Sequence, residues 1–178
     1  MDKLLYYCET GNNVQVKAIM EEHYVPNGIS PDVITDKYGR TALFLSIMNS
    51  WTFYELPQYL VSNGASLEVK DVYGKSILYH VIRTKNVNAF KFLLKNNVYL
   101  CGAIVEASIC KTALMLACEI GNPKFVKLIM FWYAKKNKKS LLCKTDVDGN
   151  TALMYAAKSS FAVTKCLLDE RYFRDSIN

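Results

Sequence analysis

Cysteine and histidine are the side chains of this 178-residue chain whose spacing could indicate metal binding or catalysis. The six cysteines include no CxxC pair, and their separations do not match zinc-knuckle or zinc-ribbon spacing. Four of them stand within or beside apolar helical patterns, where cysteine behaves as a small hydrophobic residue. We therefore expect reduced, mostly structural thiols and no metal site at Cys8, Cys101, Cys110, Cys118, Cys143 and Cys166.

The two histidines give little support to catalysis. His23 falls in an expected loop and His80 on an expected helix, and spacing alone leaves a Cys–His dyad open. No nucleophile motif, phosphate-binding loop, GxGxxG or defensible pair of carboxylates accompanies them. We expect a protein that is not an enzyme, that takes no cofactor and that has no small-molecule substrate.

A lysine-rich segment offers a different chemistry. Phe131–Ser140 reads FWYAKKNKKS, three aromatic residues followed by four lysines. It could bind an acidic partner, a nucleic acid or a membrane surface, or its aromatic residues could extend the core while its lysines are solvated. We favour solvation because charge runs usually face water. The alternative function is binding of nucleic acid or another polyanion through Lys135–Lys139. Trp51 has two similar interpretations: an exposed anchor for a partner, or a side chain that covers the core.

Composition limits the class of protein. The chain is 51% hydrophobic and 21% charged with a net charge of +6, which is typical of a globular domain. Its apolar runs fall short of the roughly 18 residues of a membrane span, and its N-terminus does not resemble a signal peptide. We expect a cytoplasmic protein, in its own or a host cell, with the nucleus left open. Abundant Lys, Asn, Tyr and Ile suggest an AT-rich genome, such as that of some parasites, bacteria or large DNA viruses, and hence action on host proteins.

An internal repeat predicts the elements that must carry any site. DVDGNTALMYAA at residues 146–157 has relatives at 36–47, 71–82 and 111–121. A hydroxyl residue begins each predicted helix, at spacings of 35, 36 and 39 residues: Thr41, Ser76, Thr112 and Thr151. Asp-x-x-Gly favours a tight turn before it, and the hydroxyl can cap the helix. A second apolar helical pattern follows, as at Phe90, Leu93 and Leu94. Neither helix can bury its apolar face alone, so the units must stack.

These motifs resemble the ankyrin repeat, through GNTALMYAA, GRTALFLSI, YLVSNGASLEVKD and GNPKFVKLIM. The resemblance covers nearly the whole chain and implies an all-α solenoid of stacked helix-turn-helix units with β-turn or hairpin fingers. We expect one domain of five repeats, with LLYYCETGNNVQVKAIM as a degenerate N-terminal cap. The expected boundaries are 1–34, 35–69, 70–105, 106–144 and 145–178.

Several residues depart from the family pattern. Where the family pattern has Pro, this chain has Ala or Ile. Where the pattern has His, this chain has Phe44, Tyr79, Met115 and Met154. We expect these residues to replace the usual Thr–His hydrogen bond with apolar packing. Ala107 and Cys110 replace Asp and Gly in the fourth finger. We expect divergent shape there, in the long segment 21–35 and in the linker 131–145. Two additional residues are expected near Asn49–Phe53 in the second repeat.

The resemblance implies that another protein is the partner, bound on a concave face formed by finger tips and the ends of the first helices. The family's contact positions correspond here to Lys37, Tyr38, Arg40, Met48, Val72, Tyr73, Lys75, Arg83, Ile109, Lys111, Glu119, Val147, Asp148, Asn150 and Lys158. Tyr and Arg predominate among binding hot spots, so Tyr38, Arg40, Tyr73 and Arg83 are the first candidates. The alternative is that these turn residues are merely solvated. The charged segment 169–175 would either cap the last repeat or leave an end open to end-to-end self-association.

Overall fold

The computed structural model describes residues 2–49, 54–98, 100, 104–106 and 109–169. The chain divides into two units. The first contains residues 1–81 and 88–98, and the second contains residues 82–87 and 99–178. Each unit is described here by itself.

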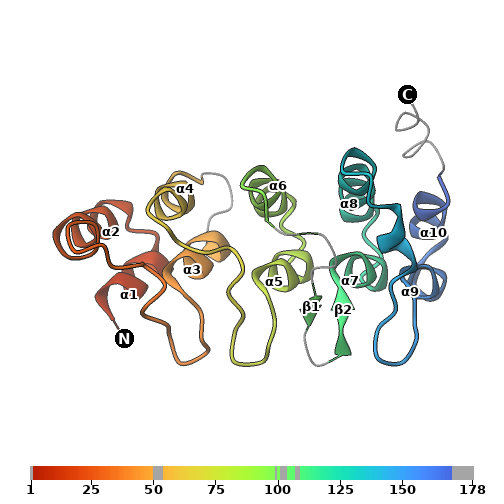
Figure 1. Ribbon diagram of the computed structural model, residues 1–178, viewed down its shortest axis with the longest axis horizontal. Coiled ribbons are helices and arrows are strands. Elements are labelled where there is room, and N and C mark those ends of the chain that lie inside the picture. The colour runs from red at the N-terminus through yellow and green to blue at the C-terminus, as the bar shows by residue number, and fades with distance from the viewer. Residues whose placement is uncertain (1, 50–53, 99, 101–103, 107–108, 170–178) are drawn as a thin grey trace. The chain divides into compact units, whose positions relative to one another are not determined.

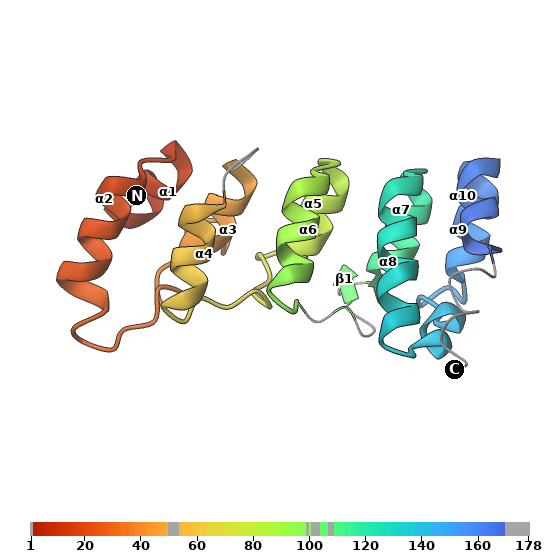
Figure 2. The same ribbon diagram turned by 90° about the horizontal axis from the view of Figure 1, so that it is seen from above.

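The first unit is built from three helix pairs. The helices are α1 (Lys3–Thr10), α2 (Asn13–Ile19), α3 (Ala42–Asn49), α4 (Glu55–Ser62), α5 (Ile77–Arg83) and α6 (Val87–Lys95), of which α5 and α6 each carry a short end in the second unit. Figures 1 and 2 show α1, α3 and α5 in one layer and α2, α4 and α6 in the other. Helix α3 packs on α1 and α4, and Tyr54 stacks on Phe92 of α6 with ring centroids 4.9 Å apart.

The second unit repeats this arrangement. A two-stranded antiparallel ladder of β1 (Ile104–Glu106) and β2 (Lys111–Thr112) precedes α7 (Ala113–Glu119) and α8 (Pro123–Lys135). A 3-10 turn, Lys139–Cys143, then leads to α9 (Ala152–Ser159) and α10 (Phe161–Leu167). Helix α7 packs on both α8 and α9, and α10 packs on α8 and α9. Each unit therefore has the predicted all-α architecture of stacked helix-turn-helix repeats with turn or hairpin fingers, and the fold class is confirmed.

The repeated hydroxyl residues cap α3, α5, α7 and α9, as predicted, while Asp2 caps α1. Each hydroxyl oxygen accepts a hydrogen bond from the backbone N–H three residues later, at 3.3–3.4 Å: Thr41 from Phe44, Ser76 from Tyr79, Thr112 from Met115 and Thr151 from Met154. A side-chain cap supplies an acceptor to a helix N–H that has no partner within the helix. The first helices thus begin at fixed residues without the proline typical of this position.

The core lies between the two layers of each unit. Leu4, Leu43, Ile47 and Leu60 are fully buried in the first unit, and the second unit buries a matching set: Leu114, Met115, Phe125, Ile129 and Tyr133. The substitution of apolar residues for histidine gives buried packing at Phe44 and Met115, as expected. For Met154 that expectation is wrong, because its side chain is 50% exposed.

Two segments expected to be irregular are partly helical. Met20–Tyr24 continues α2 as a π-helical turn, so the long segment after it is shorter than the sequence suggested. Buried Met20 and Tyr24 hold this turn against the core. In the linker after the fourth repeat, Phe131–Lys135 is the last part of α8. Trp51 and the segment 170–178 lie outside the described residues.

Candidate functional site

Each regular finger is organised by one aspartate. In the finger of residues 35–41, Asp36 accepts a backbone N–H from Gly39 on its carbonyl oxygen, and its Oδ1 accepts those of Tyr38 and Arg40 at 2.9 Å. Asp71 and Asp146 repeat this pattern in their own fingers. Three isolated antiparallel bridges close the loops, at Thr35–Thr41, Lys70–Ser76 and Thr145–Thr151. The finger backbone is therefore fixed by groups that point inward, and the tip side chains are free to face outward.

The second carboxylate oxygen of each aspartate has a different partner. Asp36 pairs with the Arg40 guanidinium at 2.6 Å, Asp71 with His80 Nε2 at 2.9 Å, and Asp146 accepts the Tyr155 hydroxyl at 2.6 Å. Burial raises the pKa of Asp36, but the hydrogen bonds from Arg40 and Tyr38 outweigh it and hold that pKa below its usual value. The hydrogen bond from Tyr155 likewise lowers the pKa of Asp146, and burial together with Asp146 raises the pKa of Tyr155.

The fourth finger lacks both the aspartate and the glycine. Its described part is the β1–β2 ladder, with an irregularity between Ile104 and Glu106. Cys110 stands where the other fingers have glycine, and its φ of +53° keeps the left-handed conformation that Gly39 has at +74°. A non-glycine residue pays a steric cost in that region. The described end of this finger thus keeps the left-handed conformation found in the other fingers, although a cysteine takes the place of glycine.

Neighbouring fingers within each unit are joined through the main chain. In the first unit the Val72 N–H donates to the Tyr38 carbonyl at 2.9 Å. In the second unit the Val147 N–H donates to the Ile109 carbonyl at 3.2 Å. Each bond joins the same two turn positions of adjacent fingers. The fingers of each unit are therefore held in register by backbone atoms.

The first unit presents most of the predicted finger contacts to solvent. Tyr38 is 38% exposed and Tyr73 is 64% exposed, and Val72, which precedes Tyr73 in the sequence, is also exposed. The Lys37 ammonium and the Arg40 guanidinium each lie 5.0 Å from the centre of the Tyr38 ring. Half-buried Lys75 lies 4.6 Å from the Tyr79 ring. We call Lys37, Tyr38, Arg40, Val72, Tyr73 and Lys75 the finger surface.

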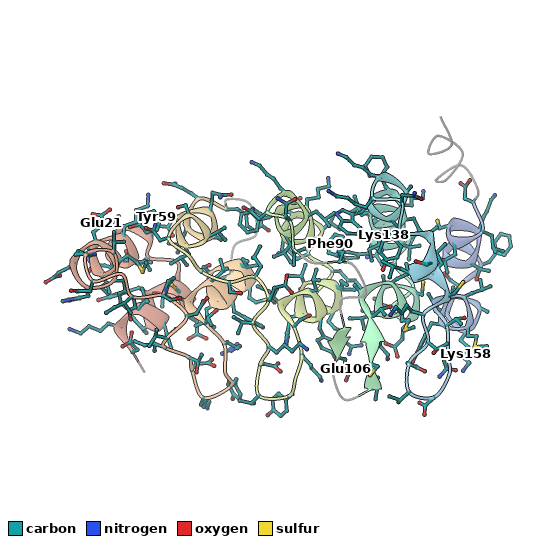
Figure 3. The ribbon with its side chains drawn as sticks, in the orientation of Figure 1. Glu21, Tyr59, Phe90, Glu106, Lys138 and Lys158 are labelled. Carbon is teal, nitrogen blue, oxygen red and sulfur yellow. The ribbon has the colours of Figure 1, made fainter. Side chains whose placement is uncertain are left out.

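The remaining predicted residues are more dispersed. Met48 is half-buried near the end of α3, and Arg83, Glu119 and Lys158 are exposed at or near the ends of α5, α7 and α9. Figure 3 shows Lys158 on α9. In the fifth finger Val147 and Asp148 are exposed, whereas Asn150 is half-buried and donates to Asp146. Ile109 in the fourth finger is half-buried.

Lys111 has an internal environment that the sequence did not reveal. Its side chain is nearly buried, its ammonium lies 3.0 Å from Glu119 Oε1, and it stands 4.8 Å from the Tyr155 ring. Tyr155 in turn donates to Asp146. The structure thus joins the two predicted contacts Lys111 and Glu119 into a network that spans α7, α9 and the fifth finger. Tyr155 was missed, although aligning it with His80, each nine residues after a finger aspartate, would have indicated it.

The thiols and the lysine-rich segment are also placed by the structure. Burial raises the pKa of the Cys8 and Cys118 thiols to about 12, as befits packed side chains. The described residues contain no cluster of three or more potential metal ligands. Nor does any helix in the described ranges have the length and apolarity to cross a bilayer. Lys135, Lys136 and Lys138 are exposed at the end of α8 and just after it, and Figure 3 labels Lys138.

Comparison with protein families agrees with this architecture. The family described as ankyrin repeats (3 copies) matches residues 4–104, 53–140 and 99–176. A comparison with curated proteins gives no match.

Proposed function

Because the chain belongs to the ankyrin-repeat family, whose repeats are general protein-interaction modules, we propose that it binds a partner protein through the finger surface. The observation that carries this proposal is the exposure of Tyr38, Val72 and Tyr73 on a backbone that inward-facing groups hold rigid. Tyrosine supplies large contact area at low entropic cost, and rigidity reduces the ordering penalty of binding. No feature of this surface points to catalysis.

The charges favour a partner with an acidic patch beside an apolar one. Lys37 and Arg40 lie beside the exposed Tyr38 ring, whereas the carboxylates of Asp36 and Asp71 are already engaged by Arg40 and His80. Positive charge beside an exposed ring attracts acidic surfaces and speeds their association. The proposed role is that of an adaptor, inhibitor or regulator that occupies such a surface, in the cytoplasm of its own or a host cell or in the nucleus. End-to-end self-association is part of the same proposal.

A matched pair of tyrosine substitutions tests the finger surface. Tyr73→Ala removes an exposed finger side chain, and Tyr6→Ala removes a comparably exposed ring on α1. Proteins captured from a lysate by the wild-type chain would be identified and titrated against both variants. We expect Tyr73→Ala, and more so Tyr38→Ala/Tyr73→Ala, to weaken binding at least about 10-fold, with Tyr6→Ala unchanged. Equal binding by all variants would refute the finger surface as the site.

A further inference from the structure

The positive charge of this chain is concentrated in one segment. Residues 120–145 contain seven lysines and no arginine, aspartate or glutamate, while the whole chain has a net charge of +6. The remainder of the sequence therefore has a formal net charge of −1. The segment corresponds to α8 and the loop after it, on the side of the second unit away from the fingers (Figure 1).

The solvent face of α8 combines these lysines with an aromatic ring. Lys124, Lys127, Phe131 and Lys135 are all exposed, Phe131 to 62%. At about 100° per residue they fall within an arc of about 80° on the helix surface, opposite buried Ile129 and Tyr133. We call these four residues the α8 face. The exposed lysines Lys136 and Lys138 extend it at its C-terminal end.

Helix α10 supplies a similar surface beside α8. The two helices pack against each other and lie in the same layer of the unit (Figure 2). Phe161 is 82% exposed at the start of α10, and Lys165, one turn later, is exposed on the same side of the helix. None of the ammonium groups of the α8 face or of Lys165 has an ion-pair partner among the described residues.

We propose that the α8 face docks on an anionic lipid membrane surface, with Phe131 entering the headgroup region and the lysines contacting anionic headgroups. Lysine clusters on a helix attract acidic lipids at about 1 kcal/mol per residue, and an exposed aromatic ring among them adds apolar burial. The residue types favour lipid over other polyanions. Arginine, absent from this segment, predominates in bidentate recognition of nucleic acids.

Vesicle co-sedimentation of the full chain tests this proposal. The vesicles would contain phosphatidylcholine alone or phosphatidylcholine with about 30% phosphatidylserine, a composition chosen for strong negative surface charge. We expect binding to the phosphatidylserine vesicles that declines as salt rises, and little binding to phosphatidylcholine. The triple variant Lys124→Gln/Lys127→Gln/Lys135→Gln should bind about 100-fold more weakly, at about fivefold per lysine. Phe131→Ser should weaken binding without changing its salt dependence.

A charge-matched control separates location from net charge. Lys3→Gln/Lys70→Gln/Lys158→Gln removes three exposed lysines elsewhere and reaches the same net charge. It should retain nearly wild-type vesicle binding, and thermal unfolding would confirm that both triple variants fold. Equal loss in the two triple variants would overturn the proposal, as would absence of vesicle binding. Binding of a single-stranded RNA oligonucleotide in place of vesicles would assign the face to nucleic acid. None of these results bears on the tyrosine test of the finger surface.

Discussion

At the scale of single residues, the finger aspartates show how one side chain serves two purposes. One oxygen of Asp36, Asp71 and Asp146 shapes the turn by accepting backbone N–H groups. The other oxygen receives a donor that differs from repeat to repeat. The turn is thus common to the three fingers, and the neighbouring donor gives each finger its own electrostatic surroundings.

Asp36 should give the fold a defined pH dependence. Its folded pKa lies below the ordinary value of 3.8, so its stabilisation is present above that value and is lost as pH falls through the folded pKa. We expect Asp36→Asn to lower the free energy of unfolding by about 1–2 kcal/mol at pH 7, and the difference to shrink as pH falls below 3.8. Urea titrations at several pH values measure this. Asp148→Asn, which replaces an exposed aspartate, should change it by less than about 0.5 kcal/mol. A constant deficit for Asp36→Asn at all pH values would contradict this account.

Gly39 and Gly149 occupy the same turn position, and comparing them separates the cost of backbone strain from the cost of a close contact. Gly39 and Gly149 have φ of +74° and +77°, but a Cβ at Gly39 would lie 3.1 Å from Val72 N, whereas one at Gly149 meets nothing within 4 Å. Gly149→Ala should cost about 1 kcal/mol for the left-handed backbone. Gly39→Ala should cost more, because it also disturbs the Val72–Tyr38 hydrogen bond between fingers. Chemical denaturation of both variants measures the two losses of unfolding free energy. Equal losses would show that the structure relieves the close contact at Gly39 without further destabilisation.

At the scale of elements, the helices were the most predictable part of the structure. The hydroxyl caps and the apolar spacing of Phe90 and Leu93 depend on neighbours in sequence, which a local pattern can express. The partners of His80, Lys111 and Tyr155 come from residues eight or nine positions away, brought close only by the fold. For that reason the helices and their caps could be anticipated from local patterns, while the contacts beneath the fingers would have required a comparison of one repeat with another.

Replacing one partner of the Lys111–Glu119 pair should reduce stability more than expected from the effect of replacing both partners. Lys111 is nearly buried between α7 and α9, so Glu119→Gln leaves its ammonium without a carboxylate. We expect Glu119→Gln to destabilise by about 1–2 kcal/mol, and Lys111→Met/Glu119→Gln to cost less than the sum of its single variants. A double-mutant cycle measured by denaturation tests this. Strict additivity would mean that the pair is not coupled.

At the scale of the whole molecule, each unit obeys the nearest-neighbour logic of repeat proteins, in which a helix pair is completed by the next one. Leu114 and Met115 of α7 are buried, and α9 packs against that helix. Leu153 and Met154, at the same positions of α9, are about half exposed. A pocket of about 340 Å³ lined by Leu142, Leu153, Leu167 and Leu168 adjoins them. This apolar side of α9 is the surface on which the proposed self-association would depend.

Self-association should therefore respond to charge placed on α9. We expect sedimentation velocity to show a concentration-dependent dimer of the wild-type chain and a monomer for Leu153→Lys/Met154→Lys, because a lysine pair cannot be desolvated against a second apolar side. Val14→Lys alters an exposed residue of α2 and should leave the dimer intact. A wild-type chain that remains monomeric at its highest soluble concentration would exclude this use of the surface.

The hydrogen bond from Val72 to the carbonyl of Tyr38 has a practical consequence. Only main-chain atoms form this bond, so the side chains at both positions can be replaced while the hydrogen bond between the fingers is kept. Randomising Tyr38, Val72 and Tyr73 in a display library, with Gly39 and the aspartates left constant, would turn this unit into a source of tailored binders. Natural mutations at the same three positions would let the chain change its binding partner while the finger backbone keeps its structure.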